Sequence, residues 1–324
     1  MKLKQMFEFA IKEAIKVDPR GKKIIQKQLE KIKKEYEKLP KKKKELFDKE
    51  KLWNPYDDSR ILFGTGNEEI KRIMVGIDIG VAEILLADKL KERVDLVLAH
   101  HPSGKALAAL HNVMLLQEDW YAKFGVPISQ AEAIMQGRIE EVRRKLHPIN
   151  HTRAQDAAKL LGIPLANFHT PSDNHVNAFL QKYLERKDPY NLEELIDLLL
   201  DLPEYREAAK LNSGPIIFNG KPSNRCGKII VNMTGGTEPS KEIYAKLAQA
   251  GVSTTVEMHV NEENLKYAKE HNINIVVAGH MSSDTLGMNI LLDKIERKFH
   301  KLKVVEISGF RRFEHKKEIK KLGV

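Results

Sequence analysis

The sequence predicts an α/β protein with two pseudo-repeated α/β lobes around a shared metal site, preceded by an N-terminal helical arm. Three observations support this fold class. Apolar, strand-like runs alternate with helical patterns. The same order of segments occurs twice, and each copy ends in the motif His-x-x-Ser-Asp, at residues 169–173 and 280–284. In such folds ligands collect at the carboxyl ends of strands, where both motifs stand.

The domain organisation follows from this repeat. A chain of 324 residues with 42% hydrophobic residues can form two lobes of ordinary size, each with its own core. We expect a basic helical arm over residues 1–55, a first α/β lobe with a helical extension over 56–211, and a second α/β lobe over 212–324.

The N-terminal arm has apolar residues at helical spacing, interrupted at residues 19–21 and at Pro40. Residues 1–66 contain 19 Lys and Arg against 11 Asp and Glu, so they hold +8 of the total charge of +10. We interpret the basic run as a solvated or oligomer-contact face, with a phosphate-binding surface as the alternative. No nucleic-acid-binding motif accompanies it, so we do not expect nucleic acid as a partner.

The first lobe opens with an irregular segment that contains an edge strand. Its apolar runs then alternate between strand and helix patterns. In order, the expected elements are an edge strand at 61–63, a strand at 71–80, a helix at 82–91, a strand at 94–102, helices over 106–158, a short strand, the motif at 169–173 and helices over 174–210.

The second lobe repeats this order after a loop and short strand at 213–224. When the two repeats are aligned with two extra residues in one loop, His259 occupies the position equivalent to His101. The expected elements are a strand at 227–236, a helix at 241–249, a strand at 252–260, a helix and strand before the motif at 280–284, and a helix at 286–298.

Five of these polar residues are candidate metal ligands. Imidazole nitrogen and carboxylate oxygen suit Zn, Mn, Fe, Co or Ni, and two adjacent histidines at a strand end can face neighbouring ions. We therefore expect two divalent ions per chain. Helix capping by the two aspartates, and a surface role for the histidine pair, are the alternatives. The candidate ligands are His100, His101, Asp173, His280 and Asp284.

Two further histidines are candidates for moving a proton. His169 could bind a metal, act as an acid or base, or orient a metal ligand. His259 is a candidate through its equivalence to His101, although it could simply end a strand.

Three other features have simpler structural alternatives. The glycine-rich loop at 234–240 could hold an anion, but we favour a plain tight turn. The arginines within 308–313 could clamp an anionic substrate, but we favour a surface ion pair. Cys226 is interpreted as a packing residue.

A single cysteine excludes an intrachain disulfide and any multi-cysteine zinc or iron–sulfur site. The first residues lack the apolar stretch of a signal peptide, and no apolar run is long enough to span a bilayer. We therefore expect a cytoplasmic protein with no membrane partner.

Four segments of the chain together match a known sequence pattern. They are I-K-R-I-M-V-G-I-D-I, D-L-V-L-A-H-H-P, H-T-P-S-D and I-V-V-A-G-H-M-S-S-D-T-L-G. Through these segments, residues 56–314 resemble the Nif-three-like family (Ngg-one-interacting factor three), also known as type 2 GTP cyclohydrolase I. The resemblance implies two similar lobes around two adjacent metals, held by the five candidate ligands, and homo-oligomeric rings, typically hexamers.

One position departs from the family pattern, because Asp284 stands where the late motif usually has glutamate. With one methylene fewer, either the backbone sits closer to the metals or the second ion is held less firmly. We expect a metal-dependent hydrolase for a small nucleotide- or pterin-like substrate, and the resemblance implies a GTP cyclohydrolase-type label. The alternative is a non-catalytic metal-binding interaction or chaperone-like ring protein.

Overall fold

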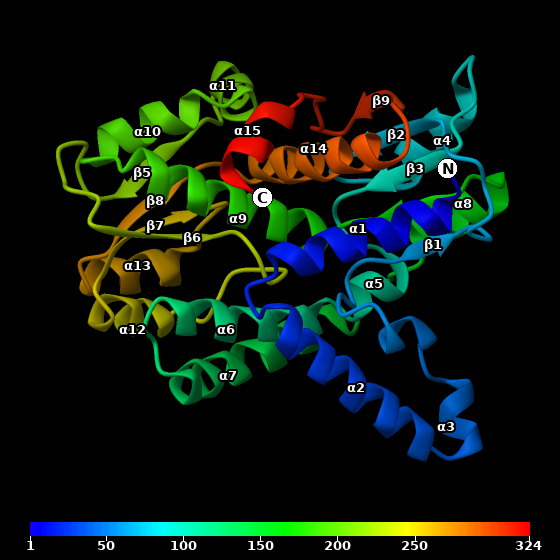
Figure 1. The fold of residues 1–324 in the computed structure, drawn as a ribbon, viewed down its shortest axis with the longest axis horizontal. Helices are drawn as coiled ribbons and strands as arrows, with labels where there is room; N and C mark the ends of the chain where they lie inside the picture. The colour runs from blue at the N-terminus through cyan, green and yellow to red at the C-terminus, as the bar shows by residue number, and fades with distance from the viewer.

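The computed structural model covers residues 1–324 and contains two mixed β-sheets (Figure 1). Strand order is β1-β4-β3-β2-β9 in the first sheet and β5-β8-β7-β6 in the second. β1 and β5 each form an antiparallel edge, and all other pairings are parallel. The strands are β1 (Ile61–Phe63), β2 (Arg72–Gly76), β3 (Leu96–Ala99), β4 (Leu165–Asn167), β5 (Ile216–Asn219), β6 (Lys228–Asn232), β7 (Val252–Glu257), β8 (Asn274–Val277) and β9 (Lys303–Ile307).

The two sheets correspond strand for strand over β1-β4-β3-β2 and β5-β8-β7-β6, so the predicted α/β fold with two repeated lobes is confirmed. β9 has no counterpart in the second sheet. It comes from the range expected for the second lobe, yet it pairs with β2 of the first sheet. The end of the chain therefore returns to the first lobe and ties the two halves together.

Two long helices, α9 (Thr170–Lys187) and α14 (His280–Lys298), lie between the sheets (Figure 1). Alternate faces of α14 enter two cores: Met288 and Leu291 pack with the first sheet, and Leu286 and Ile290 pack with the second. This sharing places the start of α14 where the two lobes meet.

Helices also cover the outer face of each sheet. The first outer core includes residues of α4, α5 and α8, and the second includes residues of α6, α7, α12 and α13. These helices are α4 (Val81–Lys89), α5 (Gly104–Ala108), α6 (Leu115–Lys123), α7 (Ile128–Leu146), α8 (Arg153–Leu161), α12 (Ile243–Gln249) and α13 (Glu262–Glu270). The core between the second sheet and the two central helices is the second inner core. It is completed by α10 (Leu192–Leu200), α11 (Pro203–Lys210) and α15 (Lys316–Leu322).

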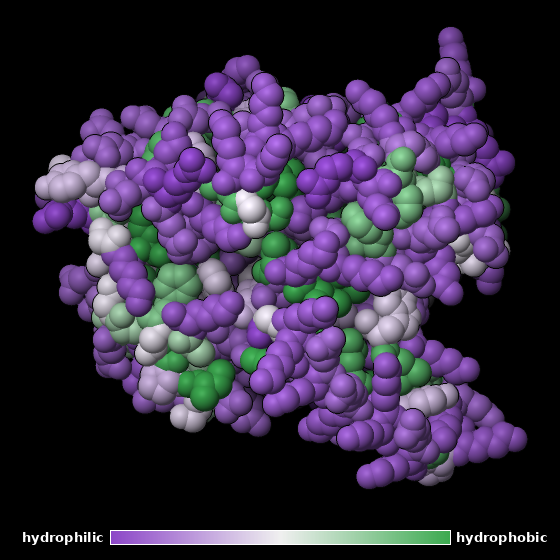
Figure 2. All heavy atoms as spheres, in the orientation of Figure 1, coloured by the Kyte–Doolittle hydropathy of each residue, from purple (hydrophilic) through white to green (hydrophobic).

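The N-terminal helices divide into a buried and an exposed part. α1 (Leu3–Val17) belongs to the first core, where the Phe7 ring stacks on Phe168 with 5.5 Å between ring centroids. α2 (Lys22–Lys38) buries only Ile25, and α3 (Lys41–Glu45) buries no residue. Figure 2 shows a mainly hydrophilic surface over this projecting pair. The basic run is therefore exposed in this chain, whereas α1 is part of the fold.

The first turn of α9 crosses α14 in close contact at Gly287. A Cβ atom added to Gly287 would lie 2.5 Å from the carbonyl oxygen of Ser172, which is far below an ordinary contact distance. Only glycine permits this approach, because backbone atoms cannot move aside as a flexible side chain can. The crossing brings Asp173 and Asp284, which flank it, toward one another.

None of the helices combines the length and the apolar character needed to cross a membrane.

Candidate metal centre

Strand ends and helix starts position the five candidate ligands. The backbone amides of His100 and His101 donate to the carbonyl oxygens of Gly76 and Ile77, which continues the β2–β3 pairing beyond β3. Asp173 lies in the first turn of α9, and Asp284 is the fifth residue of α14. Three ligand-bearing segments thus meet at the carboxyl edges of the sheets.

The helix starts differ from the sequence expectation. The second motif was expected before a helix over 286–298, but α14 begins at His280. Neither helix has a side-chain cap, so Asp173 and Asp284 do not serve as caps. Since residues four apart share one helix face, the spacing places His280 and Asp284 side by side.

The first group of candidate ligands surrounds His100. Its Nε2 atom lies 3.4 Å from Asp173 Oδ1 and 3.3 Å from Asp284 Oδ1. All three side chains are buried. The donor atoms of His100, Asp173 and Asp284 lie within 4.8 Å of one another, which is compatible with a single ion between them.

The second group uses the other oxygen of the same aspartate. Asp284 Oδ2 lies 3.3 Å from His101 Nε2 and 3.4 Å from His280 Nε2, and these two nitrogens are 3.4 Å apart. Asp284 therefore faces both groups, one oxygen toward each. In this structure aspartate therefore reaches both groups without the extra methylene of glutamate.

Hydrogen bonding tests whether these atoms suit a cation. His100 Nε2, Asp173 Oδ1 and both carboxylate oxygens of Asp284 are buried without any hydrogen-bond partner. Leaving a buried polar atom unpaired costs about 1–3 kcal/mol, and native proteins rarely leave several together. Four such atoms of ligand type, facing one another, fit a divalent-metal site.

Outer hydrogen bonds orient the histidines toward this centre. His100 Nδ1 bonds the carbonyl oxygen of Phe168 at 3.2 Å, and His101 Nδ1 bonds Asp78 Oδ1 at 2.6 Å. With Nδ1 engaged, each ring presents Nε2 to the centre. Metal-binding histidines usually have such a partner, which sets the tautomer and the ring orientation.

The two aspartates differ in electrostatics. Burial raises the pKa of Asp173 to about 8. Burial acts the same way on Asp284, but His100, His101 and His280 outweigh it and hold its pKa well below the usual range. Burial lowers the pKa of His280 to about 4, so its ring is neutral at pH 7, the form that binds metals.

His169 and His259 lie at different depths. His169 is buried, its Nδ1 bonds Asp58 Oδ2 at 2.8 Å, and its Nε2 is 3.9 Å from Asp173 Oδ2. A ring nitrogen of His169 also groups with those of His100 and His101, which is compatible with a metal-ligand role.

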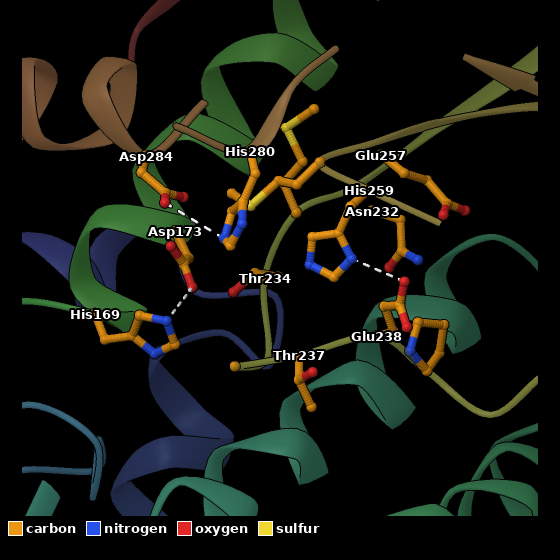
Figure 3. Close-up of a pocket in the computed structure, with 14 residues that line it drawn as sticks. His169, Asp173, Asn232, Thr234, Thr237, Glu238, Glu257, His259, His280 and Asp284 are labelled. Atoms are coloured by element: carbon orange, nitrogen blue, oxygen red, sulfur yellow. Dashed lines mark hydrogen bonds and ion pairs between the residues drawn. The ribbon is translucent and has the colours of Figure 1, made fainter. Parts of the chain in front are cut away.

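His259 lies at the exposed side of the cavity, and its Nδ1 bonds Glu238 Oε1 at 2.8 Å. Figure 3 shows its other ring nitrogen pointing toward His280. The hydrogen bond that His259 donates to Glu238 raises the pKa of His259. Its position between the metal centre and solvent suits a group that moves a proton.

Of the remaining candidate features, only one loop lies at the site. Arg312 pairs with Asp293 and Glu296 on α14, and Cys226 is buried in the second inner core. The loop at 234–240 does line the cavity beside the metal centre, through Thr234, Gly236, Thr237, Glu238 and Pro239.

Several residues of the site were not predicted from the sequence. Asp78 and Glu238 follow β2 and β6, so their place after a strand was an available signal. Asp58 had no such signal, because it lies 111 residues before His169 in an irregular segment. Asn232 and Glu257 looked like ordinary strand residues, yet both line the cavity.

Comparison with known proteins identifies the fold. The NIF3 superfamily protein from Sphaerobacter thermophilus matches with a TM-score of 0.68 and 29% identity, covering 78% of this chain and 92% of that one. This match confirms the resemblance to the Nif-three-like family. No family model and no curated protein matches the sequence.

Two other solved structures are more distant. Reduced HcgD from Methanocaldococcus jannaschii has 18% identity and a TM-score of 0.46, with 77% of this chain and 88% of that chain covered. TTHA1606 from Thermus thermophilus has 17% identity and the same TM-score, with 78% and 90% covered.

Proposed function

We propose that this chain, a structural match to the NIF3 superfamily, is a metal-dependent hydrolase with a dinuclear centre. The ligands would be His100, His101, Asp173, His280 and Asp284, with Asp284 shared between the two ions. The observation that carries the proposal is the set of four buried ligand atoms without hydrogen-bond partners. Zn, Mn, Fe, Co and Ni all suit these donor atoms.

Two divalent ions held in this way would lower the pKa of water and stabilise negative charge on a substrate oxygen. The protein's own contribution is proton transfer and orientation. His259, paired with Glu238, would give a proton to a leaving group, since its raised pKa favours the protonated ring. His169, fixed by Asp58, would orient Asp173 or take a proton within the buried part of the cavity.

The cavity beside the centre has a volume of about 50 Å³ and opens to solvent, so only the reacting part of a substrate would enter it. Its lining is mostly polar. A small nucleotide- or pterin-like molecule is therefore the proposed substrate class, and hydrolysis of a C–N or phosphoester bond is the proposed reaction.

The test combines metal analysis with turnover. Protein loaded with each candidate metal would be assayed on a panel of nucleotides, pterins and phosphoesters, beside His101→Ala and the exposed control His271→Ala. We expect wild type and His271→Ala to turn over the same substrate and His101→Ala to lose turnover and about one metal equivalent.

Two outcomes would contradict the proposal. The non-catalytic ring protein would be favoured if wild-type protein binds two ions but turns over nothing in the panel. Light scattering would then detect the mass of a six-chain ring. Wild-type protein that retains no divalent ion after loading and dialysis would remove the metal centre itself.

A further inference from the structure

The two lobes differ at one matched pair of positions beside the metal centre. At the ends of β2 and β3 the paired residues are Gly76 and Ala99, whereas at the ends of β6 and β7 they are Asn232 and Glu257. Each pair stands just before the segment that leads to His101 or His259. The first lobe shows that the fold needs no polar side chain there.

Both polar side chains are buried and line the cavity. Asn232 is 9% exposed and Glu257 is 2% exposed. In Figure 3 they lie beyond His259, on the side away from Asp284 and His280. They thus stand at the end of the cavity opposite the proposed ligands.

The hydrogen bonds of this pair are incomplete. Asn232 Oδ1 accepts from the Tyr121 hydroxyl at 3.0 Å, while its Nδ2 donates to no acceptor in the chain. Glu257 accepts from the Tyr244 hydroxyl at 2.8 and 3.1 Å and forms no ion pair with Lys or Arg. Burial raises the pKa of this carboxyl to about 7. A buried carboxylate without a cation costs stability, which indicates a purpose other than folding.

We propose that Asn232 and Glu257 form a recognition subsite for the edge of a cyclic amide, in which a ring N–H and a ring carbonyl are neighbours. Glu257 would accept from the N–H and Asn232 Nδ2 would donate to the carbonyl oxygen. The two residues are register partners on adjacent strands, about 4.8 Å apart, so one ring edge can reach both.

This subsite deepens the proposed function and rests on it for the identity of the ligand as a substrate. The amide edge would lie at one end of the cavity and the reacting bond would lie toward the metals. Tyr121 and Tyr244 would hold the two recognition side chains in place from the outer core of the second lobe.

The probe is uracil, which has two N–H groups beside carbonyls, compared with 1,3-dimethyluracil, which has none. Binding to metal-loaded protein would be measured by calorimetry and ligand-observed NMR. We expect wild type to bind uracil and not the dimethyl compound, because a site built for an N–H rejects a ligand without it. Glu257→Gln and Asn232→Ala should each weaken uracil binding by at least about tenfold, and the exposed control Glu270→Gln should not.

Equal binding of both compounds, or uracil binding unchanged in both subsite variants, would overturn the proposal. Binding that vanishes in His101→Ala but persists in Glu257→Gln would mean that uracil ligates the metal, and this result would overturn it as well. This experiment measures binding, so its result is independent of the turnover assay. Wild-type protein that binds uracil through Glu257 but turns over no substrate would support the subsite and refute the hydrolase.

Discussion

Replacing Gly287 with alanine tests whether the close crossing of α9 and α14 creates the metal centre. The added Cβ would lie 2.5 Å from the Ser172 carbonyl oxygen and 3.0 Å from its carbon. An ordinary contact needs about 3.4 Å or more, so the helices must separate by roughly 1 Å. Because Asp173 adjoins Ser172 and Asp284 lies one helical turn before Gly287, the two carboxylates would separate as well.

The expected stability change is the balance of two effects. Overpacking a buried contact costs about 1–3 kcal/mol, and alanine in place of glycine returns about 1 kcal/mol of helix propensity. Gly287→Ala should therefore lose up to about 2 kcal/mol. Gly137→Ala in α7 is the matched control, since nothing lies within 4 Å of the added Cβ and only the helix gain of about 1 kcal/mol remains.

The assays are urea unfolding of the metal-free protein and metal titration by calorimetry. We expect Gly287→Ala to be less stable than Gly137→Ala by about 1–3 kcal/mol and to bind the second ion at least about tenfold more weakly than wild type. The reasoning is refuted if Gly287→Ala takes up two ions with wild-type affinity and is as stable as the control.

Three other predictions concern buried charges. Burial raises the pKa of Glu257 from 4.5 in the unfolded chain to about 7 in the folded chain, so the folded chain holds this proton more tightly. The stability that the bound proton contributes is therefore fully present below pH 4.5 and is lost as the pH rises through 7. Glu257→Gln should therefore be more stable than wild type at pH 8, by up to roughly 3 kcal/mol, with a smaller gain at pH 5; equal gains at both values would contradict this. Glu13 on α1 forms an ion pair with buried Lys294 on α14, and Glu13→Gln removes the charged partner. Thermal unfolding should therefore show a loss of about 3 kcal/mol in the free energy of unfolding, whereas the double variant Glu13→Leu with Lys294→Met should be near neutral. A wild-type melting temperature for Glu13→Gln alone would show that α1 does not depend on the pair. Asp58→Asn should lower the free energy of unfolding in urea by about 1–3 kcal/mol, because Asp58 Oδ2 accepts hydrogen bonds from His169 Nδ1 and from the backbone and hydroxyl of Thr170. A change below about 0.5 kcal/mol, the scatter expected for surface sites, would show that these hydrogen bonds do not stabilise the fold.

Much of the architecture was predictable because the repeat is local. Each β-strand and helix of the repeat carries its own apolar pattern, so β2, α4 and β3 and their counterparts β6, α12 and β7 were expected in order. Boundaries were less accurate. α14 begins six residues earlier than the expected helix at 286, so the Ser-Ser-Asp segment with its turn-forming tendency is helical and largely buried in the folded chain.

The partners of the site were harder to predict, because they are distant in the chain. Asp58 reaches His169 from 111 residues away, and Asn232 and Glu257 meet only through strand register. The position of β9 was also hidden. Its apolar run predicts a strand, but no local pattern states that it pairs with β2 of the other lobe.

By itself, the amino-acid sequence determined that the chain is an α/β repeat with histidine and aspartate at matched strand and helix ends, since hydrophobic period and motif spacing are properties of neighbouring residues. Only the tertiary structure decided that both oxygens of Asp284 face separate ligand groups, that α1 completes the first core, and that the second lobe lines the cavity with Asn232 and Glu257. The physical reason is that burial and hydrogen-bond partnership depend on contacts between distant segments, and such contacts exist only once the sheets and central helices have packed.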